Sequence, residues 1–292
     1  MSLLKKYTLD GRKDPEIRDL PTDSKKDEVA REKIDELTLK NQKRIIDLQD
    51  RLYADGREGL IIVLQAMDAA GKDSTVRHVL GGINPQGVDV YSFKQPSSEE
   101  LSHDFLWRAN THLPKRGKIA VFNRSYYEDV LVVQVHQLQK GYALPERIAR
   151  MSPEKFFKQR YRQIRNYEEY LYENGYRLVK VFLNVSKEKQ KERFLERIDL
   201  PEKNWKFSSS DLKEREHWDE YQRIYQEVIS ATATEENPWY VIPADHKWYA
   251  RYLISEAIAR TMKDMDPQYP TLPKSEAARL QECKEILLAE DD

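Results

Sequence analysis

A short apolar run followed at once by a loop of small residues is the feature that most constrains how this chain folds. Residues 60–65 read Leu-Ile-Ile-Val-Leu-Gln, and residues 66–71 read Ala-Met-Asp-Ala-Ala-Gly, with Lys72 next. A nearly continuous apolar run of this length is typical of a strand buried on both faces, as in a parallel sheet. A helix is predicted directly after the loop, over residues 73–80. Strand, loop and helix in this order predict an α/β fold.

The remainder of the chain repeats the alternation of strand and helix. Four further strands are predicted from apolar or alternating runs, at residues 88–93, 118–123, 177–185 and 238–243. Helices are predicted from apolar spacing and capping residues, at residues 25–53, 97–110, 124–138, 153–174, 187–198, 218–228, 248–262 and 275–288. Such alternation implies one parallel sheet of five strands, joined by right-handed crossovers and flanked by helices.

Turn signals and composition favour a single domain with additions at both ends. Residues 1–24 are expected to form an irregular arm, residues 25–266 the domain, and residues 267–292 a tail. The 49 Lys and Arg residues nearly balance the 50 Asp and Glu residues, which argues against a general nucleic-acid binder. A single cysteine excludes an internal disulfide, and no apolar run approaches the roughly 20 residues of a membrane span. We therefore expect a soluble, cytoplasmic protein without membrane or nucleic-acid partners.

The loop after the first strand resembles, with two changes, the pattern G-x-x-x-x-G-K-[ST] of phosphate-binding loops. Gly71 and Lys72 match, whereas Ala66 replaces the first glycine and Asp73 replaces the hydroxyl residue, which follows as Ser74. Small residues let the backbone approach an anion, so that N–H groups at the helix N-terminus point at phosphate oxygens and the lysine adds a positive charge. An ordinary strand-to-helix turn with a solvated lysine is the alternative.

Two carboxylates in this loop require a cation if the loop binds phosphate. Asp68 and Asp73 would otherwise repel the anion. The simplest interpretation is that Asp68 binds or orients Mg²⁺. For Asp73 the alternative is a favourable interaction with the positive end of the helix.

A second polar group follows the third strand, at the sheet edge where open α/β folds place their ligands. Its sequence is Asn-Arg-Ser-Tyr-Tyr-Glu-Asp over residues 123–129. Arg124 can form two parallel hydrogen bonds to phosphate oxygens. Glu128 and Asp129 are adjacent and, on a helix, differ by about 100° in direction, so one of them is expected to face the cleft. The alternative is that both cap the helix that begins there.

Together these motifs resemble the polyphosphate kinase type 2 family. The resemblance rests on four separated segments in the family's order: residues 68–72, residues 94–96 with the later Trp107-Arg108 pair, residues 123–129, and residues 205–208 ahead of Asp211. It covers roughly residues 30–265. Many members carry Asp where this chain has Asn123, so metal binding through charge is not expected at that position.

The resemblance implies a P-loop kinase-like core with a helical lid, and phosphoryl transfer between inorganic polyphosphate and nucleotides with Mg²⁺, or Mn²⁺ as an alternative. The residues expected to be catalytic are Asp68, Lys72, Arg124 and Asp129. The resemblance implies that Asp68 serves the metal and that Lys72 and Arg124 hold phosphates. Asp129 is expected either to hold a second Mg²⁺ or to orient the acceptor phosphate. The Glu128–Asp129 pair resembles the subgroup that accepts both nucleoside mono- and diphosphates. The family also implies a homo-oligomer.

Polyphosphate is a long polyanion, so several cations are expected along its groove. The residues expected to bind phosphates or polyphosphate are Ala69, Ala70, Gly71, Lys72, Asp73, Ser74, Arg77, Lys94, Arg108, Asn123, Arg124, Glu128, Arg193, Arg197, Lys203 and Lys206. Residues 193–215 are polar, basic and interrupted by Pro201, and we call them the lid segment, because closure of such a segment would exclude water from the reaction.

Two other functions are compatible with the loop alone. One is an ATP-dependent kinase of nucleotides or small metabolites on the same fold. The other is a binder of polyphosphate or nucleotide without catalysis, since Ala66 and Asp73 depart from the usual loop. Comparing ATP with polyphosphate as donors distinguishes the first, and binding without turnover would indicate the second.

Overall fold

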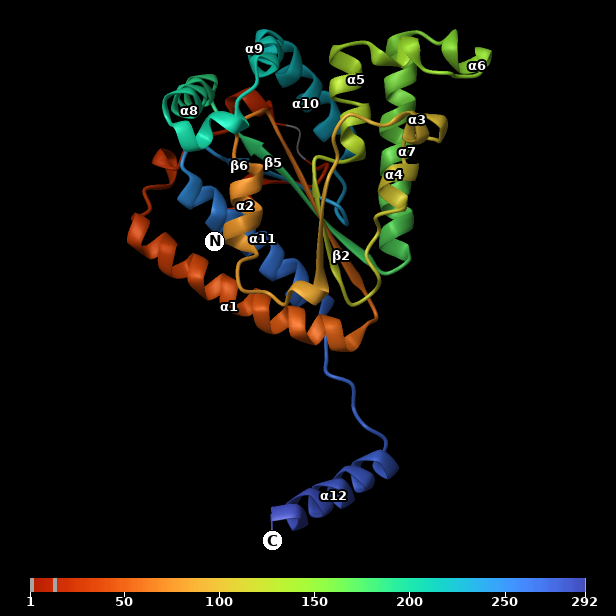
Figure 1. Ribbon diagram of the computed structural model, residues 1–292. Coiled ribbons are helices and arrows are strands. Elements are labelled where there is room, and N and C mark those ends of the chain that lie inside the picture. The colour runs from red at the N-terminus through yellow and green to blue at the C-terminus, as the bar shows by residue number, and fades with distance from the viewer. Residues whose placement is uncertain (1–2, 13–14, 292) are drawn as a thin grey trace.

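The computed structural model describes residues 3–12 and 15–291 and places six strands in one sheet, in the order β1-β6-β5-β2-β4-β3 (Figure 1). The strands are β1 (Thr8–Leu9), β2 (Gly59–Ala66), β3 (Val88–Ser92), β4 (Ile119–Asn123), β5 (Tyr176–Asn184) and β6 (Trp239–Pro243). Strands β2 to β6 pair in parallel, and β1 pairs with β6 antiparallel. The predicted α/β fold is confirmed, with each of the five predicted strands within one residue of its bounds.

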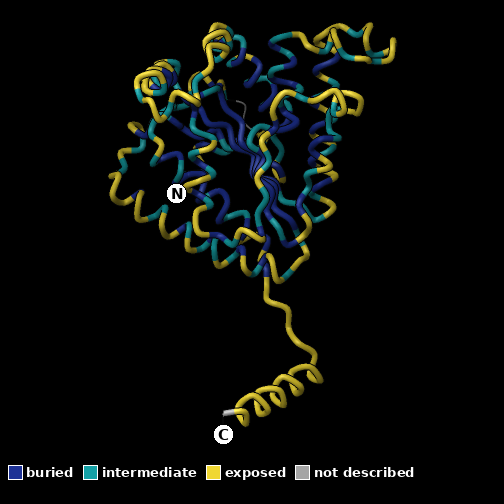
Figure 2. Tube along the Cα trace, viewed as in Figure 1, coloured by how far each residue is buried: buried dark blue, intermediate teal, exposed yellow. Residues whose placement is uncertain are grey.

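Burial on both faces explains why the central strands could be recognised. Every residue of β2 is buried, and β2 lies between β5 and β4 in the sheet. Helices α1 (Arg31–Asp55), α2 (Lys72–Val79) and α11 (Lys247–Met265) cover one face, and α7 (Pro153–Glu173) and α10 (Trp218–Thr232) cover the other (Figure 1). Figure 2 shows the sheet as the buried centre of the molecule.

The lid segment is mostly helical and lies at the carboxyl ends of the strands. It comprises the end of α8 (Lys187–Asp199), the 3-10 helix η7 (Pro201–Lys206) and most of α9 (Ser209–Glu216). Figure 1 shows α8 and α9 beside each other above the strand ends. This edge of the sheet is therefore walled on one side by the lid segment.

The single helix predicted over residues 124–138 is wrong. The chain instead forms η5 (Tyr126–Asp129), α5 (Val132–Val135) and η6 (Leu138–Gly141). Arg124 and Gln137 have φ of 64° and 52°, a left-handed conformation that a continuing right-handed helix does not contain.

The helix predicted over residues 97–110 is divided as well, into α3 (Ser98–Ser102) and α4 (Trp107–Asn110). Asp104 separates the two by accepting a hydrogen bond from the N–H of Leu106 at 2.9 Å. The capping box predicted at the start is present, because Ser97 and Glu100 bond each other's backbone N–H groups.

The N-terminal arm is more regular than the sequence indicated. It contains η1 (Leu3–Tyr7), β1 and η2 (Ile17–Asp19), and η3 (Lys25–Asp27) follows it. The sequence did not predict β1, because a two-residue strand is too short to show alternation. Helix α1 begins later than predicted, at Arg31, because Glu28 has φ of 47°. Residues 1–2, 13–14 and 292, which belong to the predicted arm and tail, lie outside the described part of the chain.

The tail carries the predicted terminal helix, α12 (Lys274–Leu288), followed by η8 (Ala289–Asp291). Figure 2 shows α12 exposed and separated from the rest of the molecule by an extended segment. The two remaining short elements are η4 (Pro85–Gly87) and α6 (Glu146–Ala149). None of the helices within residues 3–12 and 15–291 combines the length and apolar character of a membrane span.

Candidate active site

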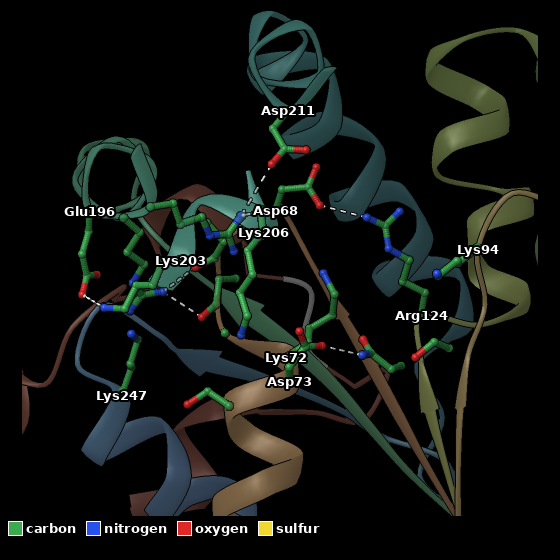
Figure 3. Close-up of a pocket in the computed structure, with 18 of the residues that line it drawn as sticks. Asp68, Lys72, Asp73, Lys94, Arg124, Glu196, Lys203, Lys206, Asp211 and Lys247 are labelled. Atoms are coloured by element: carbon green, nitrogen blue, oxygen red, sulfur yellow. Dashed lines mark hydrogen bonds and ion pairs between the residues drawn. The ribbon is translucent and has the colours of Figure 1, made fainter. Parts of the chain in front are cut away.

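An open cleft of about 680 Å³ lies between the loop after β2, the end of β4 and the lid segment (Figure 3). Most of the residues predicted to bind phosphate line it: Asp68, Ala69, Ala70, Gly71, Lys72, Asp73, Ser74, Lys94, Asn123, Arg124, Arg193, Arg197, Lys203 and Lys206. Six residues that the sequence did not single out for binding line it too: Ser92, Phe93, Gln95, Glu196, Asp211 and Lys247. The topology thus brings five distant segments of the chain to one site.

The loop after β2 has the backbone of an anion-binding turn. Ala69 and Gly71 have φ of 59° and 114°, and α2 begins immediately afterwards at Lys72. Lys72 Nζ donates to the carbonyl oxygen of Ala66 at 3.0 Å. Burial of the amine and the nearby Arg124 cation lower the pKa of Lys72 to about 8. The charges of Asp68, Glu128 and Asp73 act against this lowering of the pKa, whereas an anion in the cleft would favour the charged amine further.

Arg124 links the two predicted motifs. Its Nη2 donates to Asp68 Oδ1 at 2.9 Å, and its Nη1 donates to Glu128 Oε2 at 3.4 Å. The charges of Glu128 and Asp68 raise the pKa of Arg124, which keeps the guanidinium protonated. Its left-handed backbone directs the chain after β4 across the loop after β2. Asp68 and Arg124 consequently stand at one point of the cleft wall.

Asp73 accepts a hydrogen bond from a neighbouring amide side chain. Asn123 Nδ2 donates to Asp73 Oδ1 at 2.7 Å. Asp73 lies in the first turn of α2, where a carboxylate is favourable to the helix. This contact ties the end of β4 to the start of α2 at the edge of the cleft.

A second cavity of about 230 Å³ adjoins the cleft and shares Asp68, Arg124 and Asp211 with it. Carboxylates dominate its polar lining, since Glu128 and Glu214 join the two aspartates. Burial and the charge of Asp68 raise the pKa of Asp211. The two carboxylates therefore lie close enough to repel each other.

Tyr221 and Tyr225 on α10 are buried and also line this second cavity. The Tyr221 hydroxyl donates to Glu214 Oε2 at 2.7 Å. Their helical spacing signalled burial, and no sequence pattern distinguished a cavity wall from a core.

Four predicted residues do not line the cleft. Arg77 is exposed on α2. Arg108 is buried over the Phe93 ring and donates to the Lys94 carbonyl oxygen at 2.9 Å. Glu128 lines only the second cavity.

Asp129, the fourth, lines neither cavity, and its nearest opposite charges are those of Arg160 and Arg108. Burial raises the pKa of Asp129 to about 7. Asp129 therefore lies outside the two cavities that Asp68 lines, and its predicted role toward a second Mg²⁺ or the acceptor phosphate stays a prediction.

The fold and the site together define an α/β protein that binds phosphate groups and is equipped for phosphoryl transfer. Such transfer asks a protein mainly for positioning and charge stabilisation, which the loop, Lys72 and Arg124 can provide. The sequence profile described as polyphosphate kinase 2 (PPK2) matches residues 26–270. The chain belongs to the polyphosphate kinase 2 family, and the predicted enzyme class is confirmed.

Individual relatives support the same assignment over most of the chain. An ADP-polyphosphate phosphotransferase of Rhodopseudomonas palustris is 49% identical over 260 residues, which cover 89% of this chain and 89% of the relative. An AMP/ADP-polyphosphate phosphotransferase of Meiothermus ruber is 42% identical and covers 91% of this chain and 96% of the relative. The crystal structure of polyphosphate kinase 2 from Arthrobacter aurescens TC1 has a TM-score of 0.78 at 38% identity, covering 87% of this chain and 88% of the other.

Proposed function

We propose that this chain transfers phosphoryl groups reversibly between polyphosphate and nucleotides, and that it accepts both ADP and AMP. The observation that carries the proposal is the junction of two cavities of opposite character at Asp68 and Arg124. The basic cleft suits a polymeric anion, and the adjoining cavity offers a place for a second substrate. The relatives named above act on ADP or on both nucleotides.

The residues of the cleft have separate roles in phosphoryl transfer. Lys72 and the N–H groups at the start of α2 bind the phosphate that is transferred, and Arg124 bridges it to the incoming phosphate. The attacking oxygen belongs to the terminal phosphate of a nucleotide, which is largely ionised near neutral pH. The reaction therefore does not require a general base from the protein.

The carboxylates of this site fit a magnesium ion. Mg²⁺ is usually held by one or two carboxylates together with substrate phosphates, and Asp68 and Asp211 face each other where the cavities meet (Figure 3). We place the ion on Asp68, as the sequence predicted, together with Asp211. Asp129, which was predicted for a second ion, lines neither cavity. Mn²⁺ would fit the same oxygen ligands. Bound there, the ion would neutralise charge on the phosphates between which the group moves.

The lid segment would close the cleft over polyphosphate. Lys203 and Lys206 on η7 line the cleft, and Arg197 Nη1 lies 3.5 Å from Asp211 Oδ2 across the segment. Lys203 is paired with Glu196. A polyanion can displace such an exposed ion pair at small cost, so its binding would draw the lid toward the loop.

The decisive experiment is a matrix of donors and acceptors. Purified protein is incubated with polyphosphate or ATP as donor and with AMP or ADP as acceptor, with and without Mg²⁺. We expect ADP from AMP and ATP from ADP with polyphosphate, and no turnover after chelation of the metal. Turnover with ATP alone would favour the ordinary nucleotide kinase, and tight polyphosphate binding without turnover would favour the non-catalytic binder.

We propose that Asp129 governs the use of AMP. It forms no hydrogen bond or ion pair within the described residues, and it lies beside Arg108 and Arg160. A half-buried carboxylate without such a partner is suited to a ligand. Asp129→Asn is expected to lower AMP turnover about tenfold more than ADP turnover, as measured by kcat/KM for each nucleotide. Equal losses for the two nucleotides would refute the assignment.

We also propose that the protein is a cytoplasmic homo-oligomer. Leu280, Ile286, Leu287 and Leu288 on α12 are each more than half exposed. Burying these side chains against another copy would remove apolar surface from water. Light scattering coupled to gel filtration is expected to give a multiple of 34.6 kDa. The nucleotide substrates are those of the cytoplasm, and cell fractionation tests the location.

A further inference from the structure

Two side chains of helix α8 donate hydrogen bonds to the carbonyl groups of the phosphate-binding loop. Gln190 and Arg193 are one helical turn apart on its inner face, and both are buried. Gln190 Nε2 donates to the carbonyl oxygen of Asp68 at 2.9 Å. Arg193 Nη1 donates to the carbonyl oxygens of Ala69 at 3.0 Å and Ala70 at 2.7 Å. Three consecutive carbonyls of the loop are therefore bound by two side chains of one helix.

The direction of these carbonyls decides what the loop can bind. In a planar trans peptide the C=O and the following N–H point in opposite directions. Carbonyls held toward α8 therefore send the N–H groups of Ala69 and Gly71 away from that helix. Neither N–H has a backbone acceptor in the described part of the chain. A loop released from α8 could instead turn its carbonyl oxygens toward the cleft, where they would repel phosphate.

Arg193 is fully engaged in this structural role. Its Nη2 donates to the carbonyl oxygens of Ala244 at 2.6 Å and Asp245 at 3.1 Å, just beyond β6. The guanidinium thus joins the loop after β2 to the loop after β6, with four carbonyl acceptors. Although the sequence predicted Arg193 as a polyphosphate ligand, these bonds already occupy both of its terminal nitrogens.

The lid segment is connected to the same contacts through Arg215 on α9. Arg215 Nη1 donates to Gln190 Oε1 at 2.7 Å and to the Lys187 carbonyl oxygen at 2.8 Å. Because Arg215 binds the amide oxygen, the amide nitrogen of Gln190 must face Asp68. The position of α9 therefore bears on the orientation of the loop.

We propose that Gln190 and Arg193 are positioning residues, which orient the phosphate-binding loop without touching substrate, and that Arg215 fixes the Gln190 amide from the lid segment. The proposal rests on the loop being the phosphate site. Long polyphosphate is bound by many cations along the cleft, whereas transfer depends on the alignment of one phosphate in the loop. Loss of a positioning residue therefore lowers kcat and leaves the KM for polyphosphate nearly unchanged.

The test uses substitutions that keep shape and remove single donors. Gln190→Glu retains the acceptor for Arg215 but places an oxygen against the Asp68 carbonyl. Arg193→Lys keeps the positive charge but has one nitrogen in place of the two that bind the four carbonyl oxygens. Each is expected to lower kcat about 10- to 100-fold, the range produced by small misplacements of reacting groups, with KM for polyphosphate within about threefold of the parent. Arg215→Met, at a partly exposed position, is expected to give a smaller loss of kcat, about threefold to tenfold, by freeing the Gln190 amide.

Two further variants serve as controls. Lys206→Gln, on η7, removes a cation that lines the cleft without contacting the loop, and it should raise KM for polyphosphate while sparing kcat. Lys191→Gln changes an exposed charge of α8 and should alter neither constant. Thermal melting verifies folding, and if Arg193→Lys does not fold, Gln190→Glu and Arg215→Met decide.

Parental kcat in Gln190→Glu, or a raised KM with unchanged kcat in Gln190→Glu or Arg193→Lys, would overturn the proposal, because the latter pattern is that of a direct ligand. Full activity of Lys72→Ala would instead show that the loop is not the phosphate site. The failure of the site assignment is thereby distinguished from the failure of the positioning role.

Discussion

The cleft and the smaller cavity beside it share one wall and carry opposite charge. The cleft has eight lysines and arginines in its lining, four of them from the lid segment, whereas Arg124 is the one cation among the described residues that line the smaller cavity. Four carboxylates line each of them, so the cleft has an excess of positive charge and the smaller cavity an excess of negative charge. Asp68, Arg124 and Asp211 belong to both. Charge is therefore sorted across a boundary of three side chains.

The different charge of the two cavities matches two demands of polyphosphate chemistry, binding of the polymer and transfer of a single phosphoryl group. A polymeric anion is stabilised by many cations, and no single one need be well placed. Transfer of one phosphoryl group requires a few groups in fixed positions with charges that balance. In the proposed function, the lid cations other than Arg193 meet the first demand, and the boundary residues meet the second. Substitutions on the boundary should change kcat, and substitutions deep in the cleft should change KM for polyphosphate.

The largest effect is expected at Lys72. Lys72→Ala removes the cation that we propose contacts the transferred phosphate, and kcat should fall about 1,000-fold or more, the scale of losing a principal charge-stabilising group. Steady-state rates with polyphosphate and ADP measure this, with thermal melting as the check on folding. Arg77→Ala, on the exposed side of α2, is the matched control and should retain parental activity. Activity of Lys72→Ala within tenfold of the parent would place the reaction elsewhere.

Asp68→Asn is expected to have the next largest effect, a loss of about 100-fold in kcat. The amide keeps the shape of the side chain but weakens both the proposed metal site and the ion pair with Arg124, which spans 2.9 Å. The apparent activation constant for Mg²⁺ should rise, and Asp211→Asn should raise it too. If Asp129→Asn raised it and Asp211→Asn did not, the metal role predicted for Asp129 from sequence would be restored.

The pH dependence of Lys72 offers a third test. Its pKa of about 8 in the folded protein lies below the ordinary 10.5, so the ligand-free protein loses the charge as pH rises through 8. Phosphate binding favours the ammonium, hence kcat/KM should fall about tenfold per pH unit above pH 8. Lys72→Arg does not titrate in this range and should show a flat profile.

The lowered pKa of Lys72 also affects stability, in the opposite direction. Rising pH increases this group's contribution to the free energy of unfolding, although it lowers kcat/KM. Between pH 8 and 10.5 the unfolded chain binds more protons at Lys72 than the folded chain does. The contribution of this group to the free energy of unfolding therefore rises with pH in that window and is constant below it. A melting temperature that declined more steeply with pH in the parent than in Lys72→Met would contradict the lowered pKa.

The sheet could be predicted because its signal is local. Strands β2, β4 and β5 are apolar on both faces, so that each run of residues announces itself without reference to the rest of the chain. The segment after β4 could not be, because its breaks arise from the left-handed backbone of Arg124 and Gln137. Neither residue is a glycine or asparagine, and only the surrounding tertiary structure holds such a conformation.

The residues of the site likewise fall into those that the sequence could predict and those that it could not. Asp68, Lys72 and Arg124 lie directly after strands, where topology alone brings side chains to the ligand edge. Asp211 and Lys247 come from the lid segment and the start of α11, more than 130 residues from the loop along the chain. No spacing rule connects them to Asp68. Arg193 shows the converse, since its charge predicted a ligand and its burial against carbonyl oxygens gives it another role.

Lys247, which the sequence did not select, has the smallest expected effect, and it tests whether the two cavities bind different substrates. It lines the cleft but not the smaller cavity, and burial and the Arg193 charge lower its pKa. Lys247→Gln should raise KM for polyphosphate about twofold to fivefold and reduce its salt dependence, because one of several screened contacts is lost. KM for ADP and kcat should not change. Lys263→Gln, on the exposed side of the same helix, controls for charge. An effect of Lys247→Gln on KM for ADP would mean that the nucleotide extends into the basic cleft and that the two cavities do not separate the substrates.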